Sequence, residues 1–280
     1  MTLGEALQAA RTRIDALDAR VLLQHVTGFG HAQVAAYPER MLDAAQDSAF
    51  AALVERRAAG EPVAYLVGWR EFYGRRFGVT PAVLIPRPET ELIVELALAR
   101  MRACTAPRVL DLGCGSGILA ITLALELPQA RVSGVDASAA ALAVAGANAA
   151  ALGVCVELVE SDWYADVVED GFDLIVANPP YVAPGDPHLA QGDVRFEPRS
   201  ALVGGGPAGL SDLQAIIDGA RTRLRPGGWL LVEHGWEQGE ATRAQFAAAG
   251  FGAIETARDL AGNERVSLGQ APTSADAPTS

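Results

Sequence analysis

From Pro107 to Leu268 the chain alternates short apolar stretches with longer amphipathic ones. The short stretches are typical of buried strands, and the longer ones repeat apolar residues at helical spacing. Strands that are connected through helices run parallel, with helices on both faces of the sheet. The alternation therefore predicts an α/β fold that binds ligands at the carboxyl ends of its strands. Predicted strands are 108–112, 131–136, 154–159, 172–177, 228–234, 251–256 and 265–268, and predicted helices are 118–127, 139–152, 210–224 and 238–249.

The sequence before this alternation consists of two shorter segments. Residues 1–66 repeat apolar residues at helical spacing, which predicts a small helical domain. Residues 67–86 carry aromatic and β-branched residues around Gly74, which predicts a linking β-hairpin. The α/β domain then covers residues 87–269, and the small polar residues 270–280 are expected to form a disordered tail. Because the helical domain contains no chemical constellation of its own, we expect it to recognise a substrate.

The charge of the chain is acidic and unevenly placed. Its 22 basic residues are all arginine, and it has 34 acidic residues. Residues 1–75 contain 8 of the arginines and 9 of the acidic residues, so most of the net negative charge lies in the rest of the chain. Nucleic-acid binding needs clustered basic residues, and the sequence contains no such cluster, so we expect no direct binding to nucleic acid. The sequence shows neither an apolar run that could span a membrane nor a signal-peptide pattern. The three cysteines are widely spaced and indicate neither a metal site nor a disulfide framework. Because reduced thiols are typical of the cytosol, we expect a cytoplasmic protein.

A glycine-rich loop follows the first predicted strand of the α/β domain. Its pattern is G-x-G-x-G, because Ile118 stands where a dinucleotide-binding fingerprint would place its third glycine. Asp136 ends the second strand, where an acid can accept hydrogen bonds from ribose hydroxyls. Trp163 follows the third strand and offers an aromatic face to an adenine ring. Loop, acid and strand order together resemble the class I, Rossmann-like methyltransferase fold, and this resemblance implies S-adenosyl-L-methionine as the methyl donor.

The sequence Asn178–Pro179–Pro180–Tyr181 follows the strand at 172–177 and should lie beside the glycine loop. Two prolines fix φ and cannot donate backbone hydrogen bonds, so this loop is stiff. The Asn178 side-chain oxygen and the Pro179 carbonyl can accept both hydrogens of a planar NH₂ group, and Tyr181 adds a flat wall. Such an arrangement positions a weakly nucleophilic nitrogen for methyl transfer. The loop alone does not separate glutamine from adenine or guanine.

Several further segments narrow the family. In order along the chain, they read GWREFYG (68–74), VLIPRPETE (83–91), DLGCGSG (111–117), NPPY (178–181), GDVRFEP (192–198) and EHG (233–235). Together they resemble the release-factor glutamine methyltransferases, the protein-(glutamine-N5) methyltransferases that modify peptide-chain release factors. The resemblance covers nearly the whole chain to about Leu268. The related enzymes that methylate a ribosomal-protein glutamine diverge in the IPRPETE segment.

The resemblance implies a function and a set of site residues. The expected reaction is transfer of a methyl group to the side-chain N5 of the glutamine in the Gly-Gly-Gln motif of release factors, which serve translation termination. The alternatives are the exocyclic amine of a nucleic-acid base and a ribosomal-protein glutamine. The expected substrate contacts are Asn178, Pro179, Pro180 and Tyr181. Of these, Asn178, Pro179 and Tyr181 are also expected to be catalytic. Expected donor contacts are Gly113, Cys114, Gly115, Ser116, Gly117, Asp136, Trp163 and Asn178.

Three other groups of residues complete the sequence predictions. The Arg87–Glu91 segment is expected to cover the active site, although Glu89 and Glu91 also suit the first turn of a helix. Arg195, Phe196 and Glu197 suit either a substrate contact or a structural role. Glu233 and His234 are predicted to form a hydrogen-bonded pair in the core.

Overall fold

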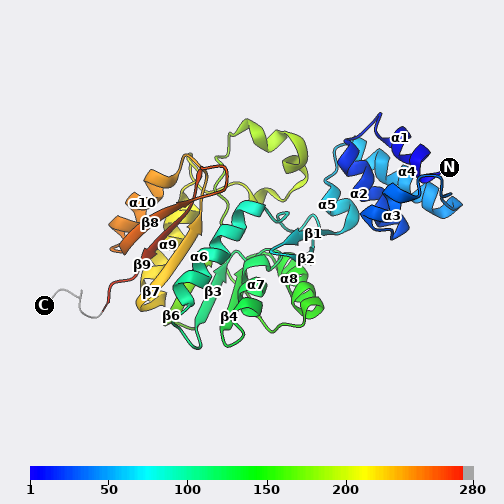
Figure 1. Cartoon of the computed structure of the whole chain (residues 1–280). Coiled ribbons are helices and arrows are strands. Elements are labelled where there is room, and N and C mark those ends of the chain that lie inside the picture. Colours follow the sequence, from blue (N-terminus) through cyan, green and yellow to red (C-terminus); the bar gives the residue numbers. More distant parts are fainter. Residues whose placement is uncertain (274–280) are drawn as a thin grey trace, which may run out of the picture. The chain divides into compact units, whose positions relative to one another are not determined.

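The computed structural model describes residues 1–273, and the chain divides into two compact units (Figure 1). Unit 1 consists of Met1–Trp69 together with Pro187–Phe196. Unit 2 consists of Arg70–Asp186 and the described chain from Glu197 onward. The sequence pattern predicted a helical domain of residues 1–66 alone. It did not indicate that a segment from the middle of the α/β region packs with that domain.

Unit 1 is a bundle of short helices. Its N-terminal part contains α1 (Leu3–Ala10), α2 (Ala16–Thr27), α3 (His31–Ala36), α4 (Ala44–Ala58) and α5 (Val63–Val67), and the distant segment adds the 3₁₀ helices η2 (Pro187–Ala190) and η3 (Gly192–Phe196). The Arg57 guanidinium joins the two parts, because it contacts Asp18 at 2.6 Å and Asp193 at 2.7 Å. Arg195 also donates to the Ala59 carbonyl at 2.8 Å. Charged hydrogen bonds of Asp193 and Arg195 therefore tie the segment 187–196 to the N-terminal part of unit 1.

A hairpin and a helix lead into the sheet of unit 2. They are β1 (Trp69–Phe72), β2 (Arg75–Gly78), η1 (Pro88–Thr90) and α6 (Glu91–Met101). The hairpin confirms the turn predicted around Gly74. Asn148 ties this region to the glycine-rich loop: its side chain accepts from Gly78 N at 2.7 Å and donates to the Ser116 carbonyl at 2.8 Å.

The main sheet has the order β5-β4-β3-β6-β7-β9-β8, and β9 is antiparallel to both of its neighbours. The pairings from β5 to β7 are all parallel. The chain runs outward from β3 to β5 and then returns to the other side of β3 with β6, which creates a crevice where ligands bind in such sheets. The strands are β3 (Arg108–Leu112), β4 (Arg131–Asp136), β5 (Glu157–Glu160), β6 (Phe172–Ala177), β7 (Leu224–Glu233), β8 (Gly252–Arg258) and β9 (Glu264–Gln270).

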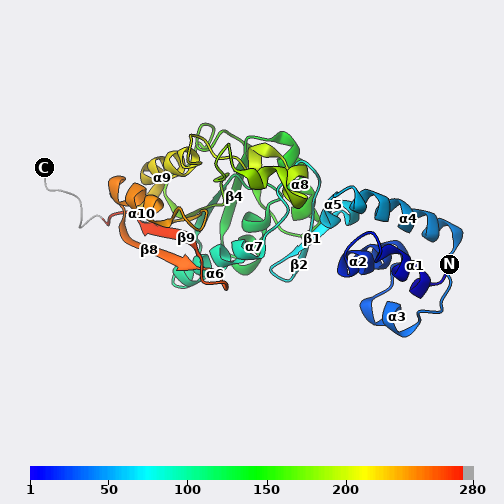
Figure 2. The same cartoon turned by 90° about the horizontal axis from the view of Figure 1, so that it is seen from above.

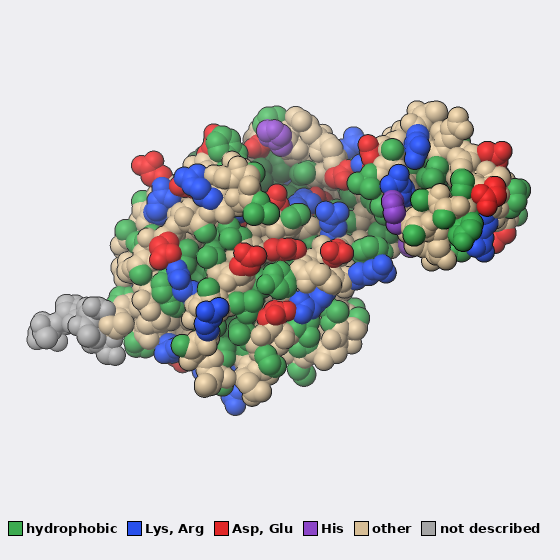
Figure 3. Space-filling view, in the orientation of Figure 1, with side chains coloured by type: hydrophobic (Ala, Val, Ile, Leu, Met, Phe, Trp, Pro, Cys, Tyr) green, Lys and Arg blue, Asp and Glu red, His purple; other side chains and the backbone are tan. Residues whose placement is uncertain are grey.

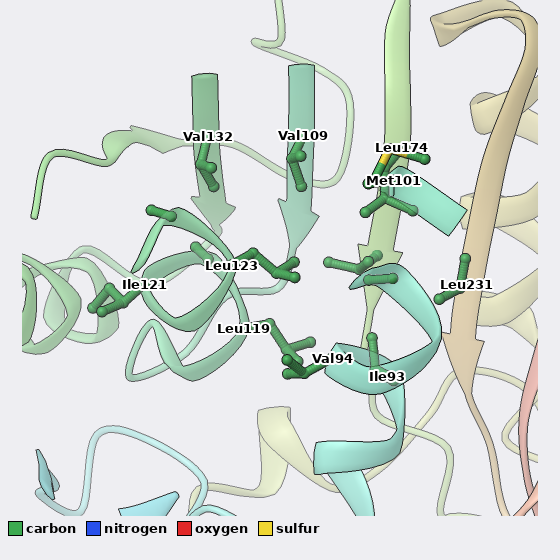
Figure 4. Close-up of a cluster of buried hydrophobic side chains, with 14 of the residues drawn as sticks. Ile93, Val94, Met101, Val109, Leu119, Ile121, Leu123, Val132, Leu174 and Leu231 are labelled. Atoms are coloured by element: carbon green, nitrogen blue, oxygen red, sulfur yellow. The ribbon is translucent and has the colours of Figure 1, made fainter. Parts of the chain in front are cut away.

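Helices cover both faces of this sheet, as the continuous apolar strands predicted. The helices of unit 2 that follow α6 are α7 (Ile118–Glu126), α8 (Ala139–Leu152), the 3₁₀ helix η4 (Arg199–Ala201), α9 (Ser211–Arg223) and α10 (Gly239–Ala248). One buried cluster joins α6 and α7 to the sheet, and a second joins α9 and α10 to the opposite face (Figure 2). In the first cluster, Val94 of α6 and Leu119 of α7 lie next to each other between the two helices (Figure 4).

The prediction of a disordered tail from residue 270 is wrong at its start. Gln270 belongs to β9, and Ala271 is buried and exchanges backbone hydrogen bonds with Gly227 and Gly228. Residues 274–280 of the predicted tail lie outside the described residues. On the face shown in Figure 3, acidic and basic side chains of unit 2 are interspersed among hydrophobic ones.

Candidate active site

A cavity of about 550 Å³ opens in unit 2 where β3, β4 and β6 end. The residues around it come from the glycine-rich loop and the start of α7, the turns after β4 and β5, the loop after β6, the segment before η1, and the chain from η4 to the start of α9. This is the edge of the sheet at which the strand order reverses. Predicted site residues that line the cavity are Gly113, Cys114, Gly115, Ser116, Asp136, Trp163, Asn178 and Pro180.

Two glycines of the loop serve different purposes. Gly115 has φ +55°, and a Cβ added there would meet no described atom within 4 Å, so its backbone borders open space. Gly117 does not line the cavity. A Cβ on Gly117 would lie 2.7 Å from Cδ1 of Ile121 and 3.2 Å from Cβ of Ala145. Gly117 thus has a packing role at the start of α7, and its contact with the methyl donor stays a prediction.

Asp136 holds the glycine-rich loop in place. One carboxylate oxygen accepts from Gly115 N at 2.9 Å, and the other accepts from Ser138 N at 2.9 Å. A carboxylate oxygen can accept two hydrogen bonds, so each oxygen retains capacity for a ligand hydroxyl. Asp136 can thus position the loop and bind a ribose at the same time.

Asp111 at the end of β3 is a cavity residue that sequence reasoning did not single out. Its carboxyl group is buried, and one oxygen accepts from Ala120 N at 3.0 Å. The other oxygen has no hydrogen-bond partner among residues 1–273. Burial, with a smaller contribution from the nearby Asp136 carboxylate, raises the pKa of Asp111 to about 7. A buried acceptor without a partner is costly, and a positively charged ligand would satisfy it. Its position two residues before the first glycine of the loop was the available signal.

Trp163 forms a wall of the same cavity. Its ring lies 3.3 Å from the position that a Cβ of Gly113 would take, so the ring is stacked close to the loop backbone. Its φ of +48° lies in the left-handed region, which a non-glycine residue occupies at a cost of about 1–3 kcal/mol. Asp162 lines the cavity beside it. The cavity thus offers a glycine cradle, four acidic side chains (Asp111, Asp136, Asp162 and Asp212) and an aromatic wall, which fit an adenosine with a charged amino-acid tail.

The Asn-Pro-Pro-Tyr loop borders the same cavity. Asn178 and Pro180 line the cavity, Pro179 is buried, and Tyr181 packs into the core behind the loop. The next residue, Val182, forms a parallel bridge with Val203, which anchors the end of the loop. The structure therefore brings the predicted donor loop and the predicted acceptor loop to one cavity.

Two family profiles match the chain: the PrmC N-terminal domain over residues 3–68 and the Methyltransferase small domain over residues 90–197. The release factor glutamine methyltransferase of Bordetella pertussis is 52% identical over 254 residues, which cover 90% of this chain and 94% of that protein. The protein of the same name from Escherichia coli is 46% identical over 256 residues, covering 90% and 91%. The chain belongs to the release factor glutamine methyltransferase family.

Solved structures confirm the fold predicted for this family member. The T. thermophilus 16S rRNA N2 G1207 methyltransferase, solved with AdoMet and guanosine, aligns with a TM-score of 0.54 at 24% identity and covers 72% of this chain and 49% of that one. The hMettl16 catalytic domain aligns with a TM-score of 0.57 at 17% identity, covering 78% and 81%. At these identities the likeness shows the methyltransferase fold alone.

Behind the Asn-Pro-Pro-Tyr loop of this family member lies a group of polar residues that the sequence did not reveal. The Asn178 side-chain nitrogen donates to the Thr90 hydroxyl at 3.1 Å, and that hydroxyl donates to Glu233 at 2.7 Å. The Tyr181 hydroxyl donates to the other Glu233 oxygen at 3.1 Å. Burial raises the pKa of Glu233 to about 7 and raises that of Tyr181 as well.

The predicted pairing of Glu233 with His234 is wrong. Glu233 bonds to Thr90 and Tyr181, whereas the His234 ring contacts the Gly235 carbonyl at 2.8 Å and the Ser267 hydroxyl at 2.9 Å. Successive residues of a strand point to opposite faces, so neighbouring side chains do not meet. Burial lowers the pKa of His234, which favours a neutral ring.

The segment before η1 borders the cavity through Pro86 and Arg87. Glu197 fixes it: the buried carboxylate accepts from Ile85 N at 2.9 Å and pairs with the Arg87 guanidinium. Glu197 is thus a structural partner of this segment. Arg195 and Phe196 belong to unit 1. Glu91, another residue with two assignments, accepts from Tyr73 N at 2.8 Å and holds the hairpin.

Two kinds of feature are absent from the described part of the chain. Among residues 1–273, no group of His, Cys, Asp and Glu side chains could hold a metal ion. Over the same residues, no helix has the length and apolar character needed to cross a membrane.

Cys114 is buried, and burial raises the pKa of its thiol, so it remains protonated within the loop.

Proposed function

We propose that the protein methylates the side-chain N5 of the glutamine in the Gly-Gly-Gln motif of peptide-chain release factors, with S-adenosyl-L-methionine as the methyl donor. One observation carries the proposal: a glycine cradle and an Asn-Pro-Pro-Tyr loop border the same cavity. The relatives that are about half identical over most of the chain bear the release-factor glutamine methyltransferase name.

Each side of the cavity has its own task in this proposal. S-adenosyl-L-methionine supplies a methyl group carried on a positively charged sulfur. Gly113–Ser116 would face its methionine part, Asp136 its ribose and Trp163 its adenine. The partnerless oxygen of Asp111 would face the charged tail, since an acidic acceptor satisfies a cationic group.

The acceptor side orients the glutamine amide. An amide nitrogen is a weak nucleophile because its lone pair is delocalised, so the site must position it. The Asn178 side-chain oxygen and the Pro179 carbonyl would accept its two hydrogens and hold the nitrogen toward the methyl group. As the N–C bond forms and the S–C bond of the donor breaks, positive charge develops on that nitrogen, and both acceptors stabilise the charge. The sulfur leaves as a neutral thioether, and one N–H proton is then lost to water. Tyr181 keeps its proton, because burial raises the pKa of its hydroxyl, and it supports the loop.

Methyl transfer from labelled donor to a purified release factor tests the function. We expect stoichiometric labelling of the wild-type release factor and none of a release factor in which the loop glutamine is replaced by asparagine. Peptide mapping should locate the label on that glutamine. Labelling of both release factors, or of RNA or a ribosomal protein in their place, would contradict the proposed substrate.

We further propose that unit 1 recognises the release factor. Unit 1 exposes large apolar side chains, with Leu17 63% and Met41 65% exposed. Leu17→Glu and Met41→Glu should each raise KM for the release factor several-fold while leaving kcat and donor affinity unchanged. Val168→Glu is the matched control, because Val168 is a 95% exposed apolar residue of unit 2. Equal KM values for all of these variants would remove this role.

A further inference from the structure

A chain of hydrogen bonds connects three separate elements behind the acceptor loop. Glu233 ends β7, Thr90 ends η1, and Asn178 follows β6. The Thr90 hydroxyl lies 2.7 Å from Glu233 Oε2, and the Asn178 side-chain nitrogen lies 3.1 Å from the Thr90 hydroxyl. Glu233 and Thr90 are both buried, at 1% and 0% exposure, so water does not compete for these bonds. All three residues belong to unit 2.

The direction of every bond in this chain follows from the carboxylate. An ionised carboxylate only accepts, so the single proton of the Thr90 hydroxyl must point to Glu233. The Thr90 oxygen can then only accept from Asn178, which must present its NH₂ group to Thr90. The carbonyl oxygen of Asn178 is consequently directed away from Thr90, and Asn178 lines the cavity. The carboxylate thus determines which end of the Asn178 amide a ligand meets.

We propose that Glu233 and Thr90 are positioning residues that hold the Asn178 amide with its oxygen toward the cavity, so that the site accepts only a substrate group that donates N–H. The inference rests on the proposed function and deepens it, because it defines the acceptor class. A primary amide of the substrate donates two hydrogens. A glutamate carboxylate of a substrate at the same place would instead put a second acceptor next to the Asn178 oxygen. A site built for a donor rejects an analogue that lacks it far more strongly than apolar contacts could.

Tyr181 strengthens the same arrangement. Its hydroxyl donates to Glu233 Oε1 at 3.1 Å, so the two carboxylate oxygens hold the first and last residues of the Asn-Pro-Pro-Tyr loop, one of them through Thr90. Burial raises the pKa of Tyr181 and keeps this hydroxyl a donor. A glutamine at position 233 would offer one acceptor and one donor group, and it could not receive both hydroxyl protons.

The arrangement makes the orientation of Asn178 sensitive to pH. Burial raises the pKa of Glu233 to about 7. The hydrogen bonds from Thr90 and Tyr181 and the charge of Arg265 in β9 lower this pKa, whereas the charge of Glu89 in η1 raises it. Arg87 also acts on the adjoining Tyr181 hydroxyl. When Glu233 is protonated it can donate to Thr90, and the hydroxyl no longer has a fixed direction. Turnover should therefore fall as the pH falls through the pKa of Glu233.

The test compares variants of the full-length enzyme on the release factor. We expect Glu233→Gln and Thr90→Val to lower kcat about ten-fold or more, with donor Kd within about two-fold of wild type. Thr90→Ser keeps the hydroxyl and should retain kcat within about three-fold. Ser267→Ala is the matched control: it removes a buried hydroxyl from β9 that bonds His234 and lies outside this chain of bonds, and its kcat should be unchanged.

Two further readouts separate positioning from general damage to the fold. At saturating donor, the wild-type kcat/KM for the release factor should show an acid limb that is absent from Glu233→Gln. The side-chain ¹⁵N signal of Asn178, assigned by its loss in Asn178→Ala, should show slow NH₂ exchange in wild type and Thr90→Ser and fast exchange in Thr90→Val and Glu233→Gln. This exchange does not depend on the substrate, so it stands even if the release factor is not methylated. Wild-type kcat in Thr90→Val, or unchanged exchange in both variants, would overturn the proposal.

Discussion

The donor side and the acceptor side of the cavity are built in different ways. On the donor side, backbone atoms of the glycine-rich loop border the open space, and Asp136 holds that loop through Gly115 N. Asp111 there keeps a buried oxygen without a partner among the described residues. On the acceptor side, Thr90, Glu233 and Tyr181 satisfy one another, and the side-chain oxygen of Asn178 is left for a ligand.

This contrast predicts different consequences of substitution. A buried polar group that lacks a partner gains one when its ligand binds, so the donor side should contribute mainly to affinity. A fully satisfied network is rigid, and it can hold one side chain in the orientation that the reaction requires. Donor-side changes should therefore alter donor Kd, whereas acceptor-side changes should alter kcat.

The largest effect is expected at Asn178. Asn178→Ala removes an acceptor from the proposed amide site and frees the nitrogen to rotate, so kcat should fall about 100-fold or more. Asn178→Asp keeps an acceptor but adds a charge that costs desolvation, and it should retain partial activity. Donor Kd, measured by calorimetry, should change much less than kcat in both variants. If Asn178→Ala retained kcat within about three-fold of wild type, the loop would have a structural role and no catalytic one.

The next largest effect is expected at Gly115, on the donor side. A valine there would place a branched side chain into the open space beside the loop, at a φ that β-branched residues avoid. We expect donor Kd to rise about 100-fold, with a cooperative thermal transition retained. Gly153→Val is the matched control, because Gly153 has a similar φ of +68° and open space but lies at the end of α8. Equal donor affinity in both variants would break the contrast between the two sides.

A smaller effect is expected at Asp136. Its proposed hydrogen bonds to ribose hydroxyls involve a charged acceptor and contribute about 1.5–3 kcal/mol, so Asp136→Ala should weaken donor binding about ten-fold or more. The variant also loses the Gly115 contact, which Asp136→Asn can partly keep through its remaining oxygen. Once donor is saturating, kcat should approach the wild-type value. A large loss of kcat at saturating donor would show that the two sides do not act separately.

Sequence patterns predicted the elements whose signals are local. The bounds of β3, β4, β6 and α8 coincide with the predicted 108–112, 131–136, 172–177 and 139–152 because each element is a continuous apolar or amphipathic run. The order of Ala271 was missed because it depends on backbone bonds to Gly227 and Gly228, far away in the sequence. The segment 187–196 was missed for the same reason, since Arg57 reaches Asp193 across 136 positions.

The residues of the candidate site also differ in whether their signal in the sequence is local. The glycine-rich loop and the Asn-Pro-Pro-Tyr loop are contiguous motifs, so their residues could be named from the sequence alone. Thr90 and Glu233 are 143 positions apart, and only the carboxyl edge of the sheet brings them together. Asn148 likewise reaches Gly78 and Ser116 from the far end of α8. Side chains that position other side chains leave no spacing for a sequence pattern to detect.

The smallest predicted effect concerns pH and donor affinity at Asp111. Burial raises the pKa of this carboxyl to about 7, so it is ionised above neutral pH and protonated below it. Only the ionised form offers both oxygens as acceptors to a cationic donor tail, so donor affinity should rise with pH through about 7 and then level off. Between about pH 8 and pH 6 we expect a three- to ten-fold change in donor Kd, measured by calorimetry without release factor. Asp111→Asn should remove this dependence, while Glu233→Gln should retain it, because Glu233 acts on the acceptor side. A pH dependence that persists in Asp111→Asn and disappears in Glu233→Gln would reverse the assignment of the two carboxyl groups.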